Sequence, residues 1–268
     1  MPAATPSRPI ALITGASSGI GEALTHNFAD YGHDLVLVAR SEDKLKALAT
    51  ALEAEHGVKV LVLPADLSET GAVEKLVATV KCRRRVPDVL VNCAGVLEQK
   101  HFVKVKPAGH QAIIDLNISA LTAMLAHLLP LMVARGSGRV LNVASIAAFQ
   151  PIPLLATYAA SKAYVLSLTE SLSEELKGTG VTITALCPGI TANHMLNVAT
   201  DANGQLAKLP DFLIGNVDDV AQDGFDACMR GDVICVPGVI NRAAMLASRS
   251  TPKWLLRRVG GYLARKAG

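Results

Sequence analysis

The chain has 268 residues, of which 50% are hydrophobic and 18% are charged. This charged fraction lies below the average of about 25% for soluble proteins, and a chain of this length can bury a large core in one domain. The net charge of +3 is too small to indicate nucleic-acid binding. We therefore expect no nucleic-acid partner.

The cysteines and the N-terminus indicate a cytoplasmic protein. Five cysteines are scattered without a CxxC pair: Cys82, Cys93, Cys187, Cys228 and Cys235. An odd, unpatterned set predicts reduced thiols rather than disulfides or a zinc site. The first residues, MPAATPSRP, lack the apolar stretch of a signal peptide.

Short apolar runs alternate with helical patterns along the whole chain. The predicted strands are 10–14, 34–39, 58–63, 88–92, 139–144, 181–186 and 232–236. The predicted helices are 19–31, 42–56, 69–82, 110–135, 157–177 and 217–230. Continuous, β-branched strands are typical of a sheet covered on both faces. The alternation predicts an α/β fold, a single-domain Rossmann-type doubly wound parallel sheet of about seven strands, over residues 1–268.

Two segments stand out from this pattern. Residues 190–215 follow a predicted strand end and have a weak period. Because ligands bind beyond the carboxyl ends of such strands, we predict a substrate lid there. The apolar segment 120–133 is too short to span a bilayer and contains His127 and Pro130. We interpret it as a buried helix.

The first predicted strand leads into the glycine-rich stretch TGASSGIG at 14–21. One glycine allows a tight turn, and two others allow close approach of the backbone to a phosphate and of the helix to the sheet. The helix that begins there offers unpaired N–H groups and a positive dipole end. The predicted nucleotide contacts in this stretch are Gly15, Ser17, Ser18, Gly19, Ile20 and Gly21, with Ser17 and Ser18 as candidate hydroxyl contacts to a phosphate.

Motifs over roughly residues 9–240 resemble those of the short-chain dehydrogenase/reductase family in order and spacing. TGASSGIG has its TGxxxGxG spacing, NCAG at 92–95 looks like its NNAG segment, and YAASK at 158–162 matches its YxxxK motif. Further matches are Asn117, Ser145 and CPGIT at 187–191. The chain looks most like general oxidoreductase and 3-oxoacyl reductase members.

Four residues form the catalytic set that the resemblance implies. Tyr158 would exchange a proton with a substrate carbonyl or alcohol, and Ser145 would hydrogen-bond the substrate oxygen. A free tyrosine has a pKa of about 10, and Lys162 one turn away, together with a positively charged nicotinamide, would favour the phenolate. Lys162 would also bind the nicotinamide ribose. Asn117 would hold a water that links Lys162 to solvent.

The end of the second predicted strand indicates the cofactor. An acidic residue there would bind the ribose of NAD, but the strand ends LVAR. Arg40 can pair with a 2′-phosphate, so we predict NADP (NADPH) over NAD, unless Arg40 is only a solvated charge. The other cofactor contacts that the resemblance implies are Asp66, Leu67, Asn92, Ala94, Gly95, Tyr158, Lys162, Pro188, Gly189 and Thr191. Asp66 could instead cap a helix, with Ser68 as a competitor, and Thr191 could be a plain helix cap.

Cysteine and histidine chemistry is expected to be minor. Cys93 stands where the family usually has a second asparagine, and we interpret it as a small packed residue rather than a reactive thiol. The seven histidines show no HxH or HExxH spacing, so no metal is predicted. His194 in the predicted lid is a candidate substrate contact.

The predicted function is NADP-dependent hydride transfer to or from a carbonyl/alcohol pair. The predicted lid is mostly apolar, which favours a hydrophobic substrate, lipid-like or 3-oxoacyl. The alternatives are an NAD-linked alcohol or hydroxysteroid dehydrogenase and a non-catalytic NADP-binding sensor or scaffold. The resemblance implies a homodimer or homotetramer.

The C-terminal segment 249–268 is basic, with six Lys or Arg and no acid. Apolar residues interleave with these charges, as in segments that lie on anionic membranes. Weak peripheral membrane contact and packing against a subunit surface both remain open.

Overall fold

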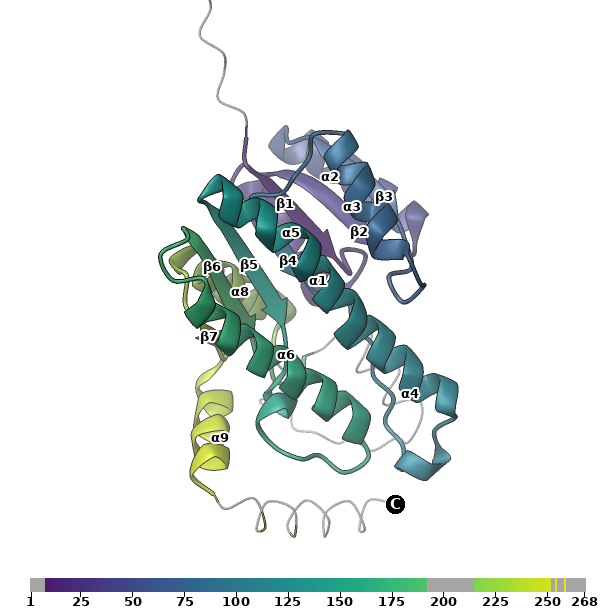
Figure 1. The fold of residues 1–268 in the computed structure, drawn as a ribbon, viewed down its shortest axis with the longest axis vertical. Helices are drawn as coiled ribbons and strands as arrows, with labels where there is room; N and C mark the ends of the chain where they lie inside the picture. The colour runs from purple at the N-terminus through teal and green to yellow at the C-terminus, as the bar shows by residue number, and fades with distance from the viewer. Residues whose placement is uncertain (1–7, 192–214, 252–253, 255–257, 259–268) are drawn as a thin grey trace, which may run out of the picture.

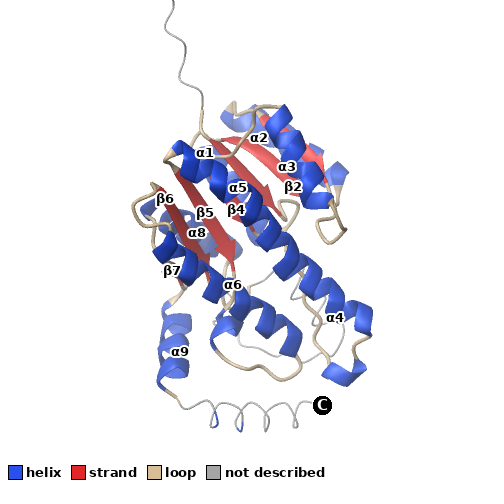
Figure 2. Ribbon diagram, in the orientation of Figure 1, coloured by secondary structure: helices blue, strands red, loops and turns tan. Residues whose placement is uncertain are grey.

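A seven-stranded parallel sheet forms the centre of the computed structural model, which describes residues 8–191, 215–251, 254 and 258. The strands are β1 Ile10–Thr14, β2 Asp34–Ala39, β3 Val60–Pro64, β4 Val89–Asn92, β5 Gly138–Val143, β6 Val181–Leu186 and β7 Ile234–Cys235. Their order is β3-β2-β1-β4-β5-β6-β7, and Figures 1 and 2 show helices in front of and behind them. The predicted doubly wound fold is confirmed, and every strand end lies within two residues of its prediction.

Helices cover both faces of the sheet. They are α1 Gly19–Asp30, α2 Glu42–His56, α3 Ala72–Cys82, α4 Pro107–Ile114, α5 Leu121–Arg135, α6 Ala156–Glu175, α8 Val217–Arg230 and α9 Val239–Ser250. Side chains alternate along each strand, so Val36 and Val38 pack under α3, α5 and α6. Leu35 and Leu37 pack under α1, α2 and α8. This double burial explains why the strands are apolar without interruption.

Helix α9 was not predicted from the sequence. Its apolar residues Val239, Ile240 and Leu246 are exposed in the structure. The sequence analysis predicted no helix after the strand at 232–236.

One long helix runs from Pro107 to Arg135 and joins α4 to α5. Between them, Asp115–Ala120 forms the π-helical stretch η2. The helix is long and apolar enough to cross a membrane by length and composition, but 44% of its most apolar window is buried in the protein. Residues such as Met124 and Leu128 pack in the core, which confirms the buried helix predicted at 120–133.

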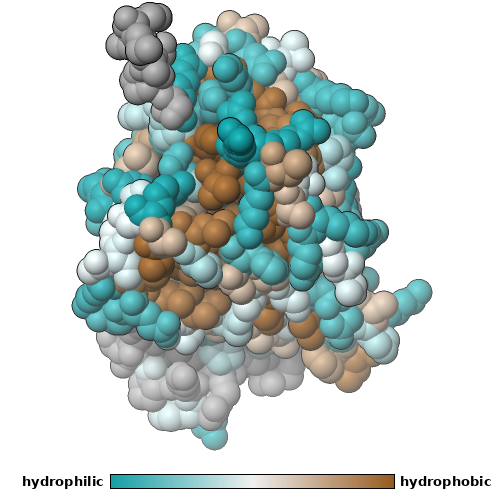
Figure 3. All heavy atoms as spheres, turned by 45° about the horizontal axis from the view of Figure 1, so that its top comes forward, coloured by the Kyte–Doolittle hydropathy of each residue, from teal (hydrophilic) through white to brown (hydrophobic). Residues whose placement is uncertain are grey.

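Apolar side chains are partly exposed on the helices α5 and α6. Figure 3 shows brown, apolar side chains gathered in the central part of one face. Val133 on α5 and Tyr164 on α6 are partly exposed, at 38% and 36%. These two helices lie in front of the sheet in Figure 1.

The predicted lid and the basic tail fall mostly outside the described residues. The lid lies between Thr191 and Gly215, which pair through an isolated parallel bridge, and His194 lies within the undescribed part. In the tail, the Arg258 guanidinium lies 5.8 Å from the ring centroid of Trp254. Both segment assignments stay predictions.

Candidate active site

The four predicted catalytic residues converge near the carboxyl ends of β4 and β5. Ser145 follows β5, Tyr158 and Lys162 lie one turn apart on α6, and Asn117 lies in η2. All four side chains are buried. Buried polar groups of this kind need partners within the protein, and the side chains of Asn117, Ser145 and Lys162 make hydrogen bonds there.

Lys162 is fixed by the neighbouring strand. Its Nζ donates a hydrogen bond of 2.8 Å to the carbonyl oxygen of Val143, the last residue of β5. Burial lowers the pKa of Lys162 to about 8, against smaller raising effects of Cys93 and Cys187. The lysine therefore stays mostly protonated at pH 7 and titrates close to neutrality.

Tyr158 behaves differently from its prediction. Burial raises the pKa of Tyr158 above 10, a hydrogen bond with Ser145 opposes this rise, and Cys93 adds to it. Lys162 Nζ lies 5.7 Å from the ring centroid and does not reverse the effect. In the protein alone, desolvation of the phenolate therefore outweighs the attraction of Lys162, contrary to the expected direction. The part of the expectation that rests on a positively charged nicotinamide stays a prediction.

Ser145 is held at a sharp turn between β5 and the short helix η3 Ile146–Phe149. Its Oγ accepts a hydrogen bond of 3.1 Å from the backbone N–H of Ala147. The same Oγ lies 3.5 Å from the carbonyl oxygen of Pro188, to which it donates. The hydroxyl thus lies beside both Tyr158 and the PG segment that follows β6.

Asn117 joins the long helix to the loop after β4. Its side-chain amide accepts from the N–H of Val96 and donates to the carbonyl of Val96, both at 2.9 Å. It also donates to Ser161 Oγ at 3.1 Å. π-helical turns recur at functional sites, and this one turns the amide toward that loop.

Gly95 lies between two of the predicted catalytic residues. A Cβ atom at this position would stand 3.3 Å from Asn117 Oδ1 and 3.5 Å from Lys162 Nζ. An alanine here would therefore be in close contact with Asn117. The water relay between Asn117 and Lys162 stays a prediction.

The glycine-rich turn has the shape that a pyrophosphate needs. Gly15 has φ +71°, and its Cβ would stand 2.9 Å from the Ala94 nitrogen. A Cβ on Gly21 would overlap the carbonyl oxygen of Gly15. α1 begins at Gly19, and the extended N-cap Ser18 makes no side-chain cap hydrogen bond. The N–H groups of the first turn are therefore available to an anion, and the site fits the phosphates of a dinucleotide.

Arg40 and Asp66 lie together at the ends of β2 and β3. The Arg40 side chain is 72% exposed, and its Nη1 lies 3.7 Å from Asp66 Oδ2. Asp66 Oδ1 accepts hydrogen bonds from the N–H and hydroxyl of Ser68, at 3.0 and 2.6 Å. Bonding to Ser68, aided by Arg40, lowers the pKa of Asp66. Asp66 therefore caps a turn through one oxygen and faces Arg40 with the other, while Leu67 is buried in the core.

Asn92 has a structural partner that the sequence did not predict. Its Nδ2 donates to Asn142 Oδ1 at 2.9 Å, and Asn142 Nδ2 donates to Thr169 Oγ1 at 3.0 Å. This buried chain ties β4 to β5 and α6. The side chain of Asn92 thus positions the end of β4, and its cofactor role stays a prediction.

The other predicted cofactor residues lie at the same edge of the sheet. Gly189 lies against α9, because its Cβ would stand 2.6 Å from the Asn241 amide. Thr191 is buried and pairs with Gly215. The contacts of Ser17, Ile20, Ala94, Pro188 and Thr191 with a cofactor stay predictions.

Thr14 is a positioning residue that the sequence analysis missed. Its Oγ1 accepts from the N–H groups of Cys93 and Ala94, at 3.0 and 3.1 Å. It thereby joins the glycine-rich turn to the NCAG segment. The threonine of TGxxxGxG was the available signal.

Cys93 packs against the core and is not a thiolate. Burial raises the pKa of the Cys93 thiol to about 11, although Lys162 opposes the rise. Its partly buried side chain packs with the cluster under α1. The expectation of a small buried core residue is met in part, because Cys93 packs against the core but is only partly buried.

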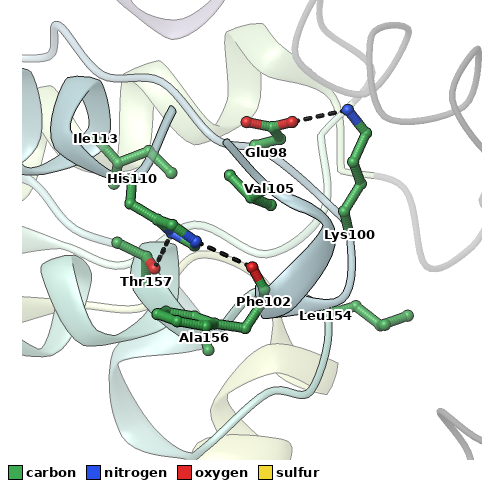
Figure 4. A pocket seen from close by; sticks show the side chains of 9 residues that line it. All are labelled: Glu98, Lys100, Phe102, Val105, His110, Ile113, Leu154, Ala156 and Thr157. Carbon is green, nitrogen blue, oxygen red and sulfur yellow. Dashed lines mark hydrogen bonds and ion pairs between the residues drawn. The ribbon is translucent and has the colours of Figure 1, made fainter. Parts of the chain in front are cut away.

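A pocket that was not predicted from the sequence lies beside the start of α6. Figure 4 shows its lining side chains: Glu98, Lys100, Phe102, Val105, His110, Ile113, Leu154, Ala156 and Thr157. The ring nitrogens of His110 lie 2.8 Å from Thr157 Oγ1 and 3.1 Å from the carbonyl oxygen of Phe102. The His110 ring also stacks on Phe102, with centroids 4.1 Å apart. This contact joins the loop after β4 to the residue that precedes Tyr158.

Comparison with known proteins agrees with this geometry. The sequence profile described as short chain dehydrogenase matches residues 9–204. A short chain dehydrogenase of Pseudocercospora fijiensis is 37% identical over 188 residues, 69% of this chain and 60% of that protein. A ketoacyl reductase of Nostoc sp. is 34% identical over 189 residues, 70% of this chain and 66% of that protein. The matched region thus spans less than two thirds of the length of these two relatives.

A solved structure gives the same picture over nearly the whole chain. A short-chain dehydrogenase from Sphingobium yanoikuyae, in complex with NADPH, superposes with a TM-score of 0.80 and 32% identity. The match covers 91% of this chain and 96% of that one. The chain belongs to the short-chain dehydrogenase/reductase family, a family of oxidoreductases, and the predicted family is confirmed.

Proposed function

We propose that this protein is an NADPH-dependent reductase of hydrophobic ketones or 3-oxoacyl compounds, reversible as an alcohol dehydrogenase. The observation that carries the proposal is the buried arrangement of Ser145, Tyr158 and Lys162 beside a glycine-rich turn that fits a pyrophosphate. The Sphingobium structure with NADPH supports the choice of cofactor.

NADPH, when bound, supplies the hydride to the substrate carbonyl carbon. Tyr158 donates its phenolic proton to the carbonyl oxygen, and its raised pKa keeps that proton in place at neutral pH. Ser145 orients the oxygen through its hydroxyl. Lys162, held by Val143, places a positive charge near the tyrosinate that forms and offers Nζ to ribose hydroxyls.

Proton resupply to Tyr158 would pass beside Gly95. Lys162 Nζ and Asn117 Oδ1 both lie close to where a Cβ of that residue would stand. Because the pKa of Lys162 is about 8, the lysine can lose and regain a proton within the physiological range. Asn117 would hold the water that completes this path.

The preference for NADPH rests on Arg40. β2 ends without a carboxylate, and the exposed guanidinium can reach a 2′-phosphate. An opposing observation supports the NAD-linked alternative, an alcohol or hydroxysteroid dehydrogenase. Asp66 lies 3.7 Å from Arg40 and partly neutralises it.

The hydrophobic substrate class rests on the apolar sequence of the predicted lid and on the name of the Nostoc ketoacyl reductase. We place the protein in the cytoplasm, consistent with its free cysteines. We also propose a homodimer or homotetramer through α5 and α6, whose partly exposed Val133 and Tyr164 would be covered. The exposed Trp254 beside Arg258 supports weak membrane contact by the tail.

The experiment is a fluorescence titration with NADPH and NADH, followed by NADPH oxidation against a panel of ketones and 3-oxoacyl thioesters. We expect tighter binding of NADPH and turnover of one hydrophobic class. Tighter binding of NADH would favour the NAD-linked alternative. Binding of NADPH without turnover of any panel member would favour a sensor or scaffold.

A further inference from the structure

Three potential metal ligands from two helices meet away from the catalytic residues. They are His26 on α1 and the last two residues of α2, Glu55 and His56, and their ligand atoms lie within 4.8 Å of one another. Across the part of the chain that the structure describes, no other group of histidines, cysteines and acids comes this close. α1 and α2 start at the carboxyl ends of β1 and β2 and run back. Their ends therefore lie near the opposite edge of the sheet from Tyr158.

The charges around this cluster favour a cation. Asp30, the last residue of α1, places Oδ1 3.8 Å from His56 Nδ1, and Glu55 Oε2 lies 3.7 Å from His56 Nε2. Two helices also end here, and each helix C-terminus carries a partial negative charge. One positive group lies nearby, because Arg8 donates to the carbonyl oxygen of Gly57 at 2.7 Å.

The distances are close to those of a tetrahedral site. Imidazole nitrogens and carboxylate oxygens bind Zn²⁺ at about 2.0–2.2 Å, which puts neighbouring ligand atoms about 3.4 Å apart. His56 is only 17% exposed, so its ring is held in place, whereas Glu55 is 67% exposed and can move. Closing the cluster requires a shift of about 1 Å in exposed side chains.

We propose that His26, Glu55 and His56 bind a divalent transition-metal ion of the Zn²⁺ class, with water as the fourth ligand. Asp30 orients the His56 ring from its other nitrogen, as carboxylates do behind histidine ligands. Two imidazoles favour Zn²⁺, Co²⁺, Ni²⁺ or Cu²⁺ over Mg²⁺ and Ca²⁺. The ion would join α1 to α2 and act on stability rather than on hydride transfer. The sequence predicted no metal because these ligands come together only in the fold.

The test is cobalt absorption with zinc competition on the untagged full chain. A Cys82→Ser background removes the exposed thiol. We expect one Co²⁺ per chain with visible bands of nitrogen and oxygen ligation, no thiolate charge-transfer band, and displacement by Zn²⁺. His26→Gln, His56→Gln and Glu55→Gln should each weaken binding at least tenfold. Zn²⁺ should raise the Tm of the parent but not of these variants.

The matched control is His127→Gln. This histidine lies on α5 and is also near a carboxylate, with Nε2 3.8 Å from Glu74 Oε1, but it belongs to no cluster of three ligands among the described residues. Its replacement should leave cobalt affinity unchanged. Circular dichroism checks that the variants fold, and Glu55→Gln changes only an exposed side chain. Absence of binding at millimolar Co²⁺, or unchanged affinity in all three ligand variants, would overturn the proposal.

Discussion

Lys162 donates a hydrogen bond of 2.8 Å from its buried ammonium to the carbonyl oxygen of Val143. This bond fixes the lysine at the end of β5, one helical turn from Tyr158. The same burial lowers the pKa of Lys162 from 10.5 to about 8. Burial at the end of β5 thus determines both the position and the pKa of Lys162. Replacing Lys162 by a residue without an amine tests both.

Lys162→Met should change how stability depends on pH. Between pH 8 and 10.5 the unfolded lysine binds a proton that the folded lysine has lost, so this group makes stability rise with pH. The full effect is on the order of 3 kcal/mol. Compared with wild type, the methionine variant should therefore gain more stability at pH 7 than at pH 10.

Urea unfolding of both proteins at the two pH values measures this difference. Titrating groups away from Lys162 affect both proteins equally, whereas Cys93 and Cys187 interact with Lys162. A stability difference that is independent of pH would contradict the lowered pKa of Lys162.

Gly95→Ala should slow catalysis more than it disturbs folding. The added methyl would stand 3.3 Å from Asn117 Oδ1 and 3.5 Å from Lys162 Nζ, and φ of Gly95 is not in the left-handed region. We expect kcat to fall about tenfold or more, with a small change in Tm. Steady-state kinetics and thermal unfolding check this. Unchanged kcat would show that the position beside Gly95 has no part in proton transfer.

Gly15→Ala should abolish tight cofactor binding. The variant combines a left-handed φ of +71° with a Cβ only 2.9 Å from the Ala94 nitrogen. The backbone strain costs on the order of 1–3 kcal/mol of stability. Gly57→Ala is the control, since it has a similar φ of +62° and an open surrounding. Equal loss of NADPH affinity in both variants would argue against the pyrophosphate role.

Arg40→Asp should reverse the cofactor preference. The carboxylate would repel a 2′-phosphate and accept hydrogen bonds from the ribose hydroxyls of NADH. We expect NADPH to bind at least tenfold more weakly, corresponding to about 1.4 kcal/mol or more. Arg85→Gln would not serve as a control, because it would remove the 2.8 Å hydrogen bond that Arg85 donates to Asp34. Lys44→Asp, on the neighbouring helix α2, tests for a general effect of charge, and an equal change there would contradict a specific role of Arg40.

The strands could be predicted because burial on both faces leaves uninterrupted apolar runs. Helix α9 was not predicted, and in the structure Val239, Ile240 and Leu246 are exposed whereas Met245 packs against the core. The residues that the structure brings together at the predicted active site were identified from motifs whose order and spacing resemble those of the family. The pKa of Tyr158 could not be predicted, since desolvation depends on packing from several elements.

Contacts between side chains that are far apart in the sequence could not be predicted either. Asn92 meets Asn142, and His110 meets Thr157, only because the fold brings β4 to β5 and the long helix to α6. His26 and His56 come together in the same way. Sequence spacing reveals side chains that meet on a single helix or strand. In each of these pairs, the two residues lie on two different segments of the fold.

In the proposed mechanism, Tyr158 donates the proton to the substrate. Tyr158→Phe removes the hydroxyl and keeps the ring. Its effect is measured as the single-turnover rate at which bound NADPH is oxidised by a substrate found in the panel. We predict a rate at least a hundredfold lower, within the usual range of about 10²–10⁴ for general acids, with NADPH affinity within threefold of wild type. A rate within tenfold of wild type would contradict the assignment of Tyr158 as the proton donor.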